Sequence, residues 1–462
     1  MSESARQSLA DLLVDGDPGA PMVLAGEETL TRADLMRDAT GVHDALVAAG
    51  VGPGEAVAAV LPDRPATLAA LFWVWLAHAV YVPLNPRATA REHARVLGEV
   101  RPAVLVRTTG VEPAGPAGDG SQEQGPPIRH DIDVALVQLT SGTTGPSKPV
   151  PLRHSTVLAL IDGVLQKLGW RGPDPGRPAQ PNLIPVSLSL WAGIYNVLFA
   201  FRVGAPVVLM EAFSTTELAE LVRRFEIRSV VLPPAAMTML CDDDTVTDLR
   251  PLRIVRSITA PLSPLQARRF RDKFGITVLN SYGQTELGGE VVGWNAADAR
   301  EHGDAKLGAV GRPHEGVDLR LDDTGELWVH TAAMGDGEYQ RTGDIATVDD
   351  DGFVWIEGRV SDMVNRGGLK VFPAEIEEVL RLHPDVQDVA VTGVPDARLG
   401  EVPWAFVVTR GAGMDARALE EHCRAHLAPY KVPVRFEAVD ALPRNEVGKV
   451  VHRDLKPEEL RS

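Results

Sequence analysis

The chain has 462 residues, of which 44% are hydrophobic and 24% charged, and its formal net charge is -17. A chain of this length is too long to fold around a single compact core, so we expect at least two domains. The acidic balance disfavours nonspecific binding to nucleic acid or an anionic membrane, and two cysteines (Cys241 and Cys423) without a disulfide framework indicate a cytoplasmic protein.

The first hundred residues alternate between helical and strand-like patterns. Residues 31–50 place apolar side chains at helical spacing, whereas residues 55–62 and 102–108 are typical of buried strands. The most apolar stretch, residues 67–84, contains a histidine and a proline, so we interpret it as a buried helix that runs into a strand. No basic segment precedes an apolar run at the N-terminus, so no signal peptide is expected. The alternation predicts an α/β domain with a largely parallel sheet.

The pattern changes further along the chain. Residues 112–127 are rich in Pro and Gly and poor in apolar residues, which indicates a surface loop. Short alternating strands separated by Asp-Gly and Thr-Gly turns then predict antiparallel β structure within residues 316–359. A small α+β pattern follows. We therefore predict an N-terminal domain of residues 1–360 and a C-terminal domain of residues 361–462.

The stretch LTSGTTGPSKP, residues 139–149, has the composition of a phosphate-binding loop. It lacks the Walker A spacing G-x-x-x-x-G-K-[ST], because Ser147 stands where the second glycine would be. Its backbone N–H groups, its hydroxyls and Lys148 would still suit an anion. By itself the stretch is equally typical of a turn between a strand and a helix. His154 follows it, and we interpret this histidine as capping or orienting the loop.

Four further motifs follow this stretch in order. They are NSYGQTELGG (280–289), YQRTGD (339–344), GRVSDMVNRGGLKVFPAEIE (358–377) and LPRNEVGKVVHRDL (442–455). Together the five resemble the signature motifs of the adenylate-forming superfamily, which includes acyl- and aryl-CoA synthetases, nonribosomal peptide adenylation domains and luciferases. The resemblance spans nearly the whole chain, and five ordered motifs are far more specific than any one of them.

The resemblance implies an α/β fold with a large N-terminal domain of α/β layers plus a distorted β-barrel, and a small mobile α+β C-terminal domain. It also implies a two-step reaction. A carboxylate attacks the α-phosphate of Mg-ATP to give an acyl-adenylate and pyrophosphate, and a thiol of CoA or of a pantetheinyl carrier then takes the acyl group. Cations and hydrogen-bond donors must neutralise the charge that builds on the α-phosphate. The implied partners are a small-molecule acid and either CoA or an acyl carrier protein.

The resemblance also assigns roles to residues. Lys449 of the small domain and Thr285 would act on the α-phosphate, and Glu286 would hold Mg²⁺ through its carboxylate oxygens. These three are the implied catalytic residues. Tyr282 would pack on the adenine, and Asp344 would accept hydrogen bonds from both ribose hydroxyls. The implied nucleotide-binding residues are Thr140, Ser141, Gly142, Thr143, Thr144, Gly145, Lys148, Tyr282, Gly283, Asp344 and Arg359.

The sequence departs from the family around the substrate. Leu188 stands where CoA synthetases commonly have a histidine. No aspartate within residues 183–202 would pair the ammonium of an amino acid, which disfavours a free α-amino acid. Ile258 and Thr259 replace a pair of glycines, which narrows the pocket and favours a small or flat acid. The implied pocket residues are Ser189, Trp191, Ala235, Thr259, Ala260 and Gly283.

Two other departures bear on the second step. The segment of residues 326–344 is shorter than usual, and Ser361 replaces the common hinge aspartate or lysine. The main prediction is ATP-dependent activation of a small or aromatic acid, followed by transfer to a thiol. One alternative activates nitrite and transfers it to an aryl amine, and another is an inactive nucleotide-binding homologue. His422 and His426 have metal-ligand spacing, but with no third ligand we interpret them as part of a solvated helix face.

Overall fold

The structure is a computed structural model that describes residues 8–114, 126–140, 148–172, 179–260, 262–332, 334–411, 413–444 and 450–455. The chain groups into two compact units. One is drawn from residues 1–140, 149–317 and 331–337, and the other from residues 141–148, 318–330 and 338–462. The mixed α/β architecture confirms the predicted fold class. The boundary at residues 360 and 361 stays a prediction, and most of the loop expected at 112–127 lies outside the described residues.

A six-stranded sheet forms part of the first unit. Its strands are β3 (Ala56–Val60), β4 (Val80–Leu84), β5 (Val104–Arg107), β6 (Gly110–Pro113), β7 (Val134–Thr140) and β8 (Lys148–Arg153). Their spatial order is β6–β5–β3–β4–β7–β8, and β3 pairs in parallel with both β4 and β5. The central strands are unbroken apolar runs such as AVAAV and VYVPL, as expected of strands that are buried on both faces.

A seven-stranded sheet forms the second layer of this unit. Its strands are β1 (Pro21–Ala25), β2 (Glu28–Thr31), β9 (Asn182–Ile184), β10 (Val207–Leu209), β11 (Ser229–Leu232), β12 (Ile254–Ser257) and β13 (Thr277–Asn280). Their spatial order is β13–β12–β11–β9–β10–β1–β2, and all neighbouring strands are parallel except β1 and β2. Five of the seven strands, β9 to β13, thus come from residues 182–280.

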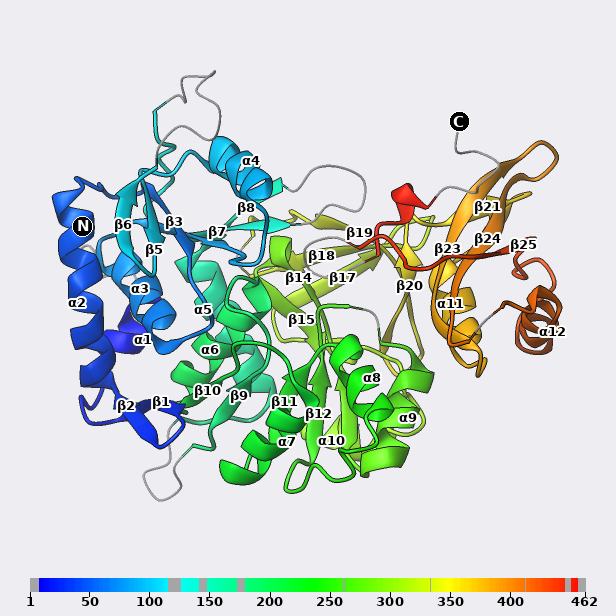
Figure 1. Cartoon of the computed structure of the whole chain (residues 1–462), viewed down its shortest axis with the longest axis horizontal. Helices are drawn as coiled ribbons and strands as arrows, with labels where there is room; N and C mark the ends of the chain where they lie inside the picture. The colour runs from blue at the N-terminus through cyan, green and yellow to red at the C-terminus, as the bar shows by residue number, and fades with distance from the viewer. Residues whose placement is uncertain are drawn as a thin grey trace. The chain divides into compact units, whose positions relative to one another are not determined.

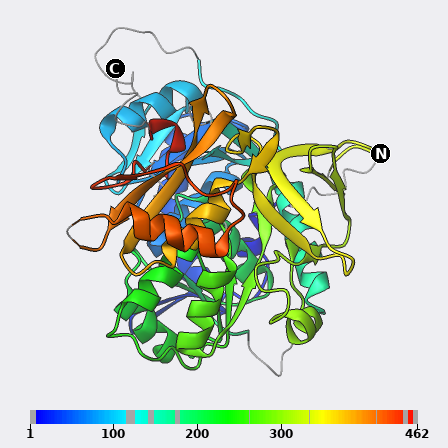
Figure 2. The same cartoon turned by 90° about the vertical axis from the view of Figure 1, so that its right-hand side faces the viewer.

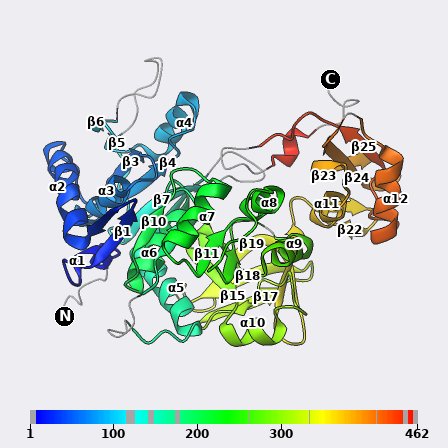
Figure 3. The ribbon, with the colours of Figure 1, turned by 60° about the horizontal axis from the view of Figure 1, so that its bottom comes forward.

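Helices cover the faces of both sheets (Figure 1). The helices are α1 (Asp11–Val14), α2 (Arg32–Ala48), α3 (Pro65–Leu76), α4 (Ala90–Val100), α5 (His154–Lys167), α6 (Trp191–Arg202), α7 (Thr215–Arg224), α8 (Pro234–Asp242) and α9 (Pro264–Phe274). α4 packs on one face of the six-stranded sheet. Figure 3 shows α7, α8 and α9 grouped together, and their apolar side chains form one core with the seven-stranded sheet.

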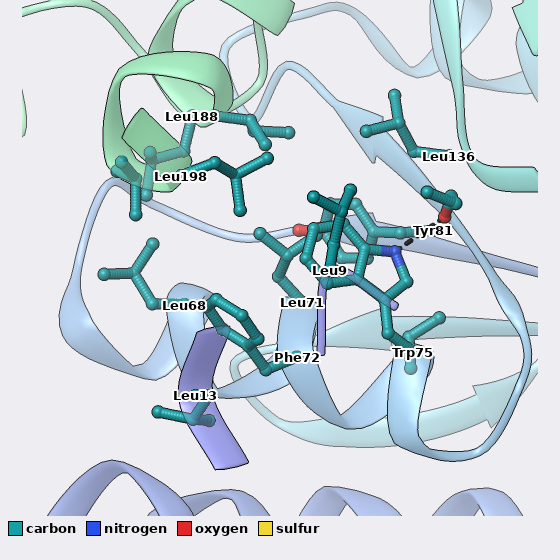
Figure 4. Packing of buried hydrophobic residues seen from close by; sticks show 14 of the residues in the cluster. Leu9, Leu13, Leu68, Leu71, Phe72, Trp75, Tyr81, Leu136, Leu188 and Leu198 are labelled. Atoms are coloured by element: carbon teal, nitrogen blue, oxygen red, sulfur yellow. Dashed lines mark hydrogen bonds between the residues drawn. The ribbon is translucent and has the colours of Figure 1, made fainter. Parts of the chain in front are cut away.

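The largest core lies among α3, α5, α6 and strands of both sheets. Figure 4 shows Phe72, Trp75 and Tyr81 at its centre, with Leu188 and Leu198 beside them. The indole Nε1 of Trp75 donates a hydrogen bond of 2.7 Å to the carbonyl of Ala135, so this buried polar group is satisfied. The apolar stretch of residues 67–84 is thus a buried helix followed by a strand, as predicted. Among the described residues no helix is both long and apolar enough to cross a membrane.

Local sequence signals explain where several helices begin. Thr31 and Thr89 cap α2 and α4, and each forms a capping box with an acidic residue three positions later. α9 starts with Pro264 after the Ser263 cap and ends at Gly275, which has the left-handed conformation (φ 68°). Capping residues therefore determine where these helices begin and end, in addition to the apolar faces by which the helices pack.

A small antiparallel sheet completes the first unit. It consists of β14 (Tyr282–Gln284), β15 (Gly289–Gly293) and β16 (Arg312–Pro313), and the short helix α10 (Ala296–His302) lies between β15 and β16 in sequence. A single 3₁₀ turn, η1 (Thr285–Leu287), joins β14 to β15. This β14–η1–β15 hairpin contains the motif YGQTELGG.

The second unit contains two sheets. β17 (Val317–Leu321), β18 (Glu326–Thr331), β19 (Gln340–Val348) and β20 (Val354–Arg359) form one, and β21 (Val364–Arg366), β22 (Leu369–Val371), β23 (Val386–Asp396), β24 (Gly400–Thr409) and β25 (Arg435–Ala438) form the other. Helices α11 (Pro373–Arg381) and α12 (Ala416–His426) pack on one face of the latter, and Figure 2 shows α12 crossing its long strands. The 3₁₀ turn η2 (His452–Asp454) follows.

Successive side chains of β24 point to opposite faces of this sheet and pack in two different cores. Ala405 and Val407 belong to the core beneath α11 and α12, whereas Trp404 and Phe406 face the opposite side with Leu442. The predicted α+β pattern after Arg359 is confirmed. The antiparallel β structure expected before it is present as β17–β20.

Candidate functional site

The β14–η1–β15 hairpin presents Thr285 and Glu286 on its connecting turn. The backbone N–H of Gly288 (φ 83°) closes the turn onto the carbonyl of Thr285 at 2.9 Å. Thr285 is half-buried, whereas the Glu286 carboxylate is exposed and makes no hydrogen bond or ion pair with the described residues. Carboxylate oxygens are the ligands that Mg²⁺ prefers, so an exposed, unpaired Glu286 suits such an ion.

The two strands of the hairpin approach unusually closely at Gly283. Gly283 pairs with Glu290, and a Cβ on Gly283 would lie 2.0 Å from the carbonyl oxygen of Gly289. No side chain fits there, so glycine is required by the packing of the hairpin itself. Tyr282 precedes it and is 8% exposed, and its hydroxyl accepts a hydrogen bond of 3.1 Å from the Gln284 amide.

A buried ionic cluster supports this hairpin from behind. Arg256 of β12 donates from Nη2 to both carboxylate oxygens of Glu290 at 2.6 and 2.5 Å, and His314 Nε2 lies 3.1 Å from Glu290 Oε1. Burial by itself would raise the pKa of Glu290, but Arg256 and His314 together lower it to about 2. Glu290 is therefore a buried anion that ties β15 to the seven-stranded sheet.

Lys167 at the end of α5 makes a second connection to the small sheet. Its Nζ donates to the backbone carbonyls of Gly293 at 2.7 Å and Arg312 at 2.5 Å. Burial lowers the pKa of Lys167 to about 8, although Glu290 and Asp298 act in the opposite direction. This ammonium therefore bridges a backbone carbonyl of β15 and one of β16.

α6 carries the predicted pocket residue Trp191 and, one turn later, Tyr195. Both side chains are buried, and their rings meet edge to face with centroids 5.7 Å apart. The ring edge of Tyr195 lies 2.8 Å from where a Cβ on Gly289 would stand, so α6 packs directly against the start of β15. Two of the predicted pocket residues, Trp191 and Gly283, therefore lie near the same part of the hairpin.

The segment before α6 is held by a buried carboxylate. Asp63 accepts a hydrogen bond of 2.7 Å from the Leu188 N–H and one of 3.1 Å from the Ser187 hydroxyl. Burial raises the pKa of Asp63. Ser189, a predicted pocket residue, is 9% exposed and contacts Ser187 through its hydroxyl at 3.0 Å. Leu188 itself lies in the core (Figure 4), which explains why an apolar side chain replaces the histidine expected here.

The remaining predicted pocket residues lie at two strand ends of the seven-stranded sheet. Ala235 is exposed near the start of α8 after β11, and Thr259 and Ala260 are exposed after β12. Thr259 has a φ of 77°, a left-handed conformation that a β-branched residue rarely adopts. It therefore keeps the backbone geometry of the glycine it replaces, at a cost in strain.

Asp344 and Arg359 lie together in the second unit. They are directly paired residues of β19 and β20, and Arg359 Nε is 3.0 Å from Asp344 Oδ1. Asp344 is 5% exposed. Nearby, the buried Glu326 accepts hydrogen bonds from Arg341 and, at 3.0 Å, from the Gly343 N–H, which fixes the backbone just before Asp344. The predicted ribose ligand is thus rigidly positioned.

Gly367 and Gly368 have a structural role in the second unit. They form the two-residue turn between β21 and β22, with φ values of 61° and 89°. A tight hairpin turn of this type needs positive φ at both positions. This requirement accounts for both glycines.

Several predicted residues lie at or outside the limits of the description. Thr140 ends β7, and Lys148 is an exposed residue at the start of β8. Ser141, Gly142, Thr143, Thr144, Gly145 and Lys449 fall outside the described residues. Because residues 141–147 lie outside the described residues, the role of capping or orienting the loop stays a prediction for His154. This histidine is buried with its Nδ1 accepting a hydrogen bond from the Leu9 N–H at 3.1 Å, and burial lowers its pKa to about 4.

The histidine pair of α12 is not a metal site in the structure. His422 Nε2 contacts the Val379 carbonyl at 2.9 Å, and His426 Nδ1 contacts the His422 carbonyl at 2.8 Å. Among the described residues no cluster of three or more His, Cys, Asp or Glu side chains is arranged to hold a metal ion.

The Arg256–Glu290–His314 cluster was not predicted from the sequence. Its one signal was a charged side chain at position 256 within the strand Ile254–Ser257.

Two family models and several known proteins are similar to this chain. The family model described as AMP-binding enzyme matches residues 13–338, and that of the AMP-binding enzyme C-terminal domain matches residues 375–449. The chain is 32% identical to the fatty acid–[acyl-carrier-protein] ligase ScoC of Streptomyces coeruleorubidus, over 95% of this chain and 93% of that protein. It is 31% identical to a feruloyl-CoA synthase from an Amycolatopsis species, over 95% of this chain and 96% of that protein.

Solved structures show the same architecture. The crystal structure of ATP-bound MatB from Rhodopseudomonas palustris superposes with a TM-score of 0.82 at 25% identity, covering 96% of this chain and 97% of that one.

Proposed function

The chain belongs to the AMP-binding enzyme family, and we propose that it activates a small or aromatic carboxylic acid with ATP before passing the acyl group to a thiol. It is an AMP-forming acid–thiol ligase that uses ATP and Mg²⁺. The acid would be converted to an acyl-adenylate with release of pyrophosphate. The acceptor would be CoA or the pantetheine of a carrier protein, the class of acceptor that the names of its two relatives specify.

The observation that carries this proposal is the turn of the β14–η1–β15 hairpin. It presents Thr285 and the exposed carboxylate of Glu286, which has no partner among the described residues, on a hairpin anchored by the buried Glu290 carboxylate. Magnesium bound at Glu286 would neutralise phosphate charge. Thr285 would donate a hydrogen bond to an α-phosphate oxygen as the acid attacks, where charge develops.

The proposed first step, formation of the acyl-adenylate, would use this turn. A carboxylate oxygen of the acid forms a bond to the α-phosphorus while the bond to the bridging oxygen of pyrophosphate breaks. Lys449 would stabilise the α-phosphate and the attacking carboxylate, and the loop of residues 140–148 would hold the β- and γ-phosphates. Asp344 would accept hydrogen bonds from the ribose hydroxyls, while the ion pair with Arg359, at 3.0 Å, orients that carboxylate.

In the second step a thiol attacks the acyl carbon and AMP leaves. We further propose a cytoplasmic location, since both cysteines of the chain, Cys241 and Cys423, are buried and free. The nitrite–amine and inactive-homologue alternatives are not favoured, because the two relatives act on carboxylic acids and join them to thiols. They remain as defined outcomes of the experiment.

The proposal is tested by measuring pyrophosphate release over a panel of small and aromatic acids, with and without CoA and a pantetheinylated carrier protein. We expect release that depends on an acid and on Mg²⁺, together with a thioester product. Release with nitrite and an aryl amine, but with none of the carboxylic acids, would support the first alternative. ATP binding without turnover on any acid would support the second.

Lys449→Ala supplies a matched test of the catalytic assignment. Loss of a cation that faces developing charge should reduce acid-dependent pyrophosphate release by about two orders of magnitude or more. Lys456→Ala, which removes a lysine seven positions further along the chain, should leave the rate within about twofold. Equal rates in both variants would contradict the role of Lys449.

A further inference from the structure

An irregular segment of the first unit, residues 185–190, joins β9 to α6 and is held by two buried polar side chains. Both come from the six-stranded sheet, whereas β9 belongs to the seven-stranded one: Asp63 follows β3, and Gln138 lies in β7. The segment contains Ser189 and leads directly into Trp191, two of the residues expected to line the pocket for the acid. The inference rests on the proposed function in this respect.

Asp63 holds the middle of the segment. Its Oδ1 accepts a hydrogen bond of 2.7 Å from the Leu188 N–H and one of 3.1 Å from the Ser187 hydroxyl. The side chain is 8% exposed, and burial raises its pKa, although these two hydrogen bonds act in the opposite direction. The segment therefore supplies donors to a buried carboxylate, and the carboxylate in turn fixes the backbone at Leu188.

Gln138 holds the next residue from a second element. Its Nε2 donates a hydrogen bond of 3.2 Å to the Ser189 carbonyl, and the side chain is 5% exposed. Its amide oxygen is buried and has no partner among the described residues, a cost that an apolar side chain after the apolar run VALV would avoid. The same strand ends at Thr140, so the contact joins the strand before the predicted phosphate loop to the pocket segment.

The first turn of α6 closes a third side of the segment. A Cβ on Gly193 would lie 2.2 Å from the Ser187 carbonyl oxygen and 2.7 Å from the Val186 carbonyl oxygen. These are backbone atoms, which no change of rotamer can move away. The backbone of residues 186–189 is therefore fixed by a carboxylate, an amide and a helix together.

We propose that Asp63 and Gln138 are positioning residues for the acid, and that they act through the backbone of residues 187–189. Among the described residues, the side-chain hydrogen bonds of both go to this segment and to none of the groups proposed to hold ATP or Mg²⁺. Loss of either anchor would let Ser189 and Trp191 shift. Binding of the acid should therefore weaken, while binding of ATP should not.

The test measures kcat, and KM for the acid and for ATP, by pyrophosphate release. The acid is the one with the highest kcat/KM among acetate, hexanoate, benzoate and cinnamate. Asp63→Ala removes the acceptor, and Gln138→Met removes the amide with little change in length. Each should raise KM for the acid by about tenfold or more and leave KM for ATP within about twofold. Asp63→Asn keeps an acceptor oxygen for the Leu188 N–H and should return KM for the acid to within about threefold of wild type.

Asp415→Ala is the matched control. The Asp415 carboxylate also accepts from two groups, the N–H groups of Arg417 and Ala418 at 3.0 Å each, but it caps α12 in the second unit. This variant loses a carboxylate with comparable hydrogen bonds and should leave both KM values within about twofold.

Two results would overturn the inference while the proposed function stands. One is a KM for the acid within about twofold of wild type in Gln138→Met, and the other is an equal rise of KM for the acid and for ATP. If Asp63→Ala does not fold, Gln138→Met decides the question by itself. Absence of acid-dependent release by the wild-type chain with every acid of the wider panel would instead contradict the proposed function.

Discussion

Glu290 helps to position the turn that carries Thr285 and Glu286. Its carboxylate is buried and opposes Gly283 across the β14–η1–β15 hairpin, and it is held by Arg256 and His314. An unpaired buried charge is strongly destabilising, whereas a paired one defines a single geometry. The cluster therefore fixes the strand that follows Thr285 and Glu286 without contacting either of them.

Glu290→Gln tests the energetic role of this cluster. Arg256 and His314 lower the folded-state pKa of Glu290 from 4.5 to about 2. A carboxyl group with a lowered pKa stabilises the fold above its unfolded pKa, and this contribution is lost as the pH falls through the folded pKa. The wild-type chain should therefore exceed Glu290→Gln by a few kcal/mol at neutral pH, on the order of a broken buried ion pair. The difference should shrink below about pH 4.5.

The measurement is the free energy of unfolding by urea between about pH 6 and pH 3. Glu220→Gln, which changes an exposed glutamate of α7, serves as the control and should show little difference at any pH. A wild-type advantage at Glu290 that is constant over this range would contradict the lowered pKa.

The hairpin is the element on which the candidate site depends. Its two strands meet so closely at Gly283 that an added Cβ would lie 2.0 Å from the Gly289 carbonyl oxygen. This contact involves backbone atoms, which cannot rotate away. The spacing of β14 and β15 sets the direction of the turn between them.

Gly283→Ala should force these strands apart. We expect a loss of about 1–3 kcal/mol in unfolding free energy, as in overpacked cores, and a larger fractional loss of pyrophosphate release because Thr285 and Glu286 move with the strand. Gly98→Ala in α4 is the matched control. Gly98 has open space around its Cβ position and lies within a helix, so alanine should stabilise by about 0.5–1 kcal/mol and leave the activity unchanged. Normal activity in a folded Gly283→Ala variant would show that the strand spacing does not position the turn.

Much of the fold follows from local sequence patterns. Apolar runs such as AVAAV predicted the parallel strands, and the Asp-Gly turns predicted the antiparallel strands β17–β20. The partners of Asp63 and Arg256 could not be predicted in this way. Asp63 binds backbone near residue 188, and Arg256 binds Glu290, 34 positions away in the chain. Such contacts depend on tertiary packing, which the local periodicity of apolar residues in the sequence does not encode.

The same limit applies to the predicted site residues. The motifs located Thr285, Glu286, Asp344 and Arg359, and the structure places each pair on one turn or one strand pair. The contact of His154 could not be predicted from its neighbours in sequence, because its hydrogen-bond partner, Leu9, is 145 residues away. The full list of phosphate-loop residues and Lys449 stays a prediction.

At the scale of the whole molecule, the residues assigned to the reaction are distributed over both compact units. Thr285 and Glu286 belong to the first unit, and Asp344 and Arg359 belong to the second. Matches to the family models also extend over both, from residue 13 to residue 449. The proposed function therefore has to be tested on the full chain, with both steps of the reaction.

In the proposed first step, a carboxylate oxygen of the acid attacks the α-phosphorus of ATP. The most direct test uses an acid labelled with ¹⁸O in its carboxylate, ATP, Mg²⁺ and CoA, and locates the label in the products by mass spectrometry. We expect one ¹⁸O atom in AMP and none in pyrophosphate, because the attacking oxygen remains on the α-phosphate when the thiol displaces AMP from the acyl carbon. Formation of ADP with the label in inorganic phosphate would contradict the claim, since it would place the attack on the γ-phosphorus.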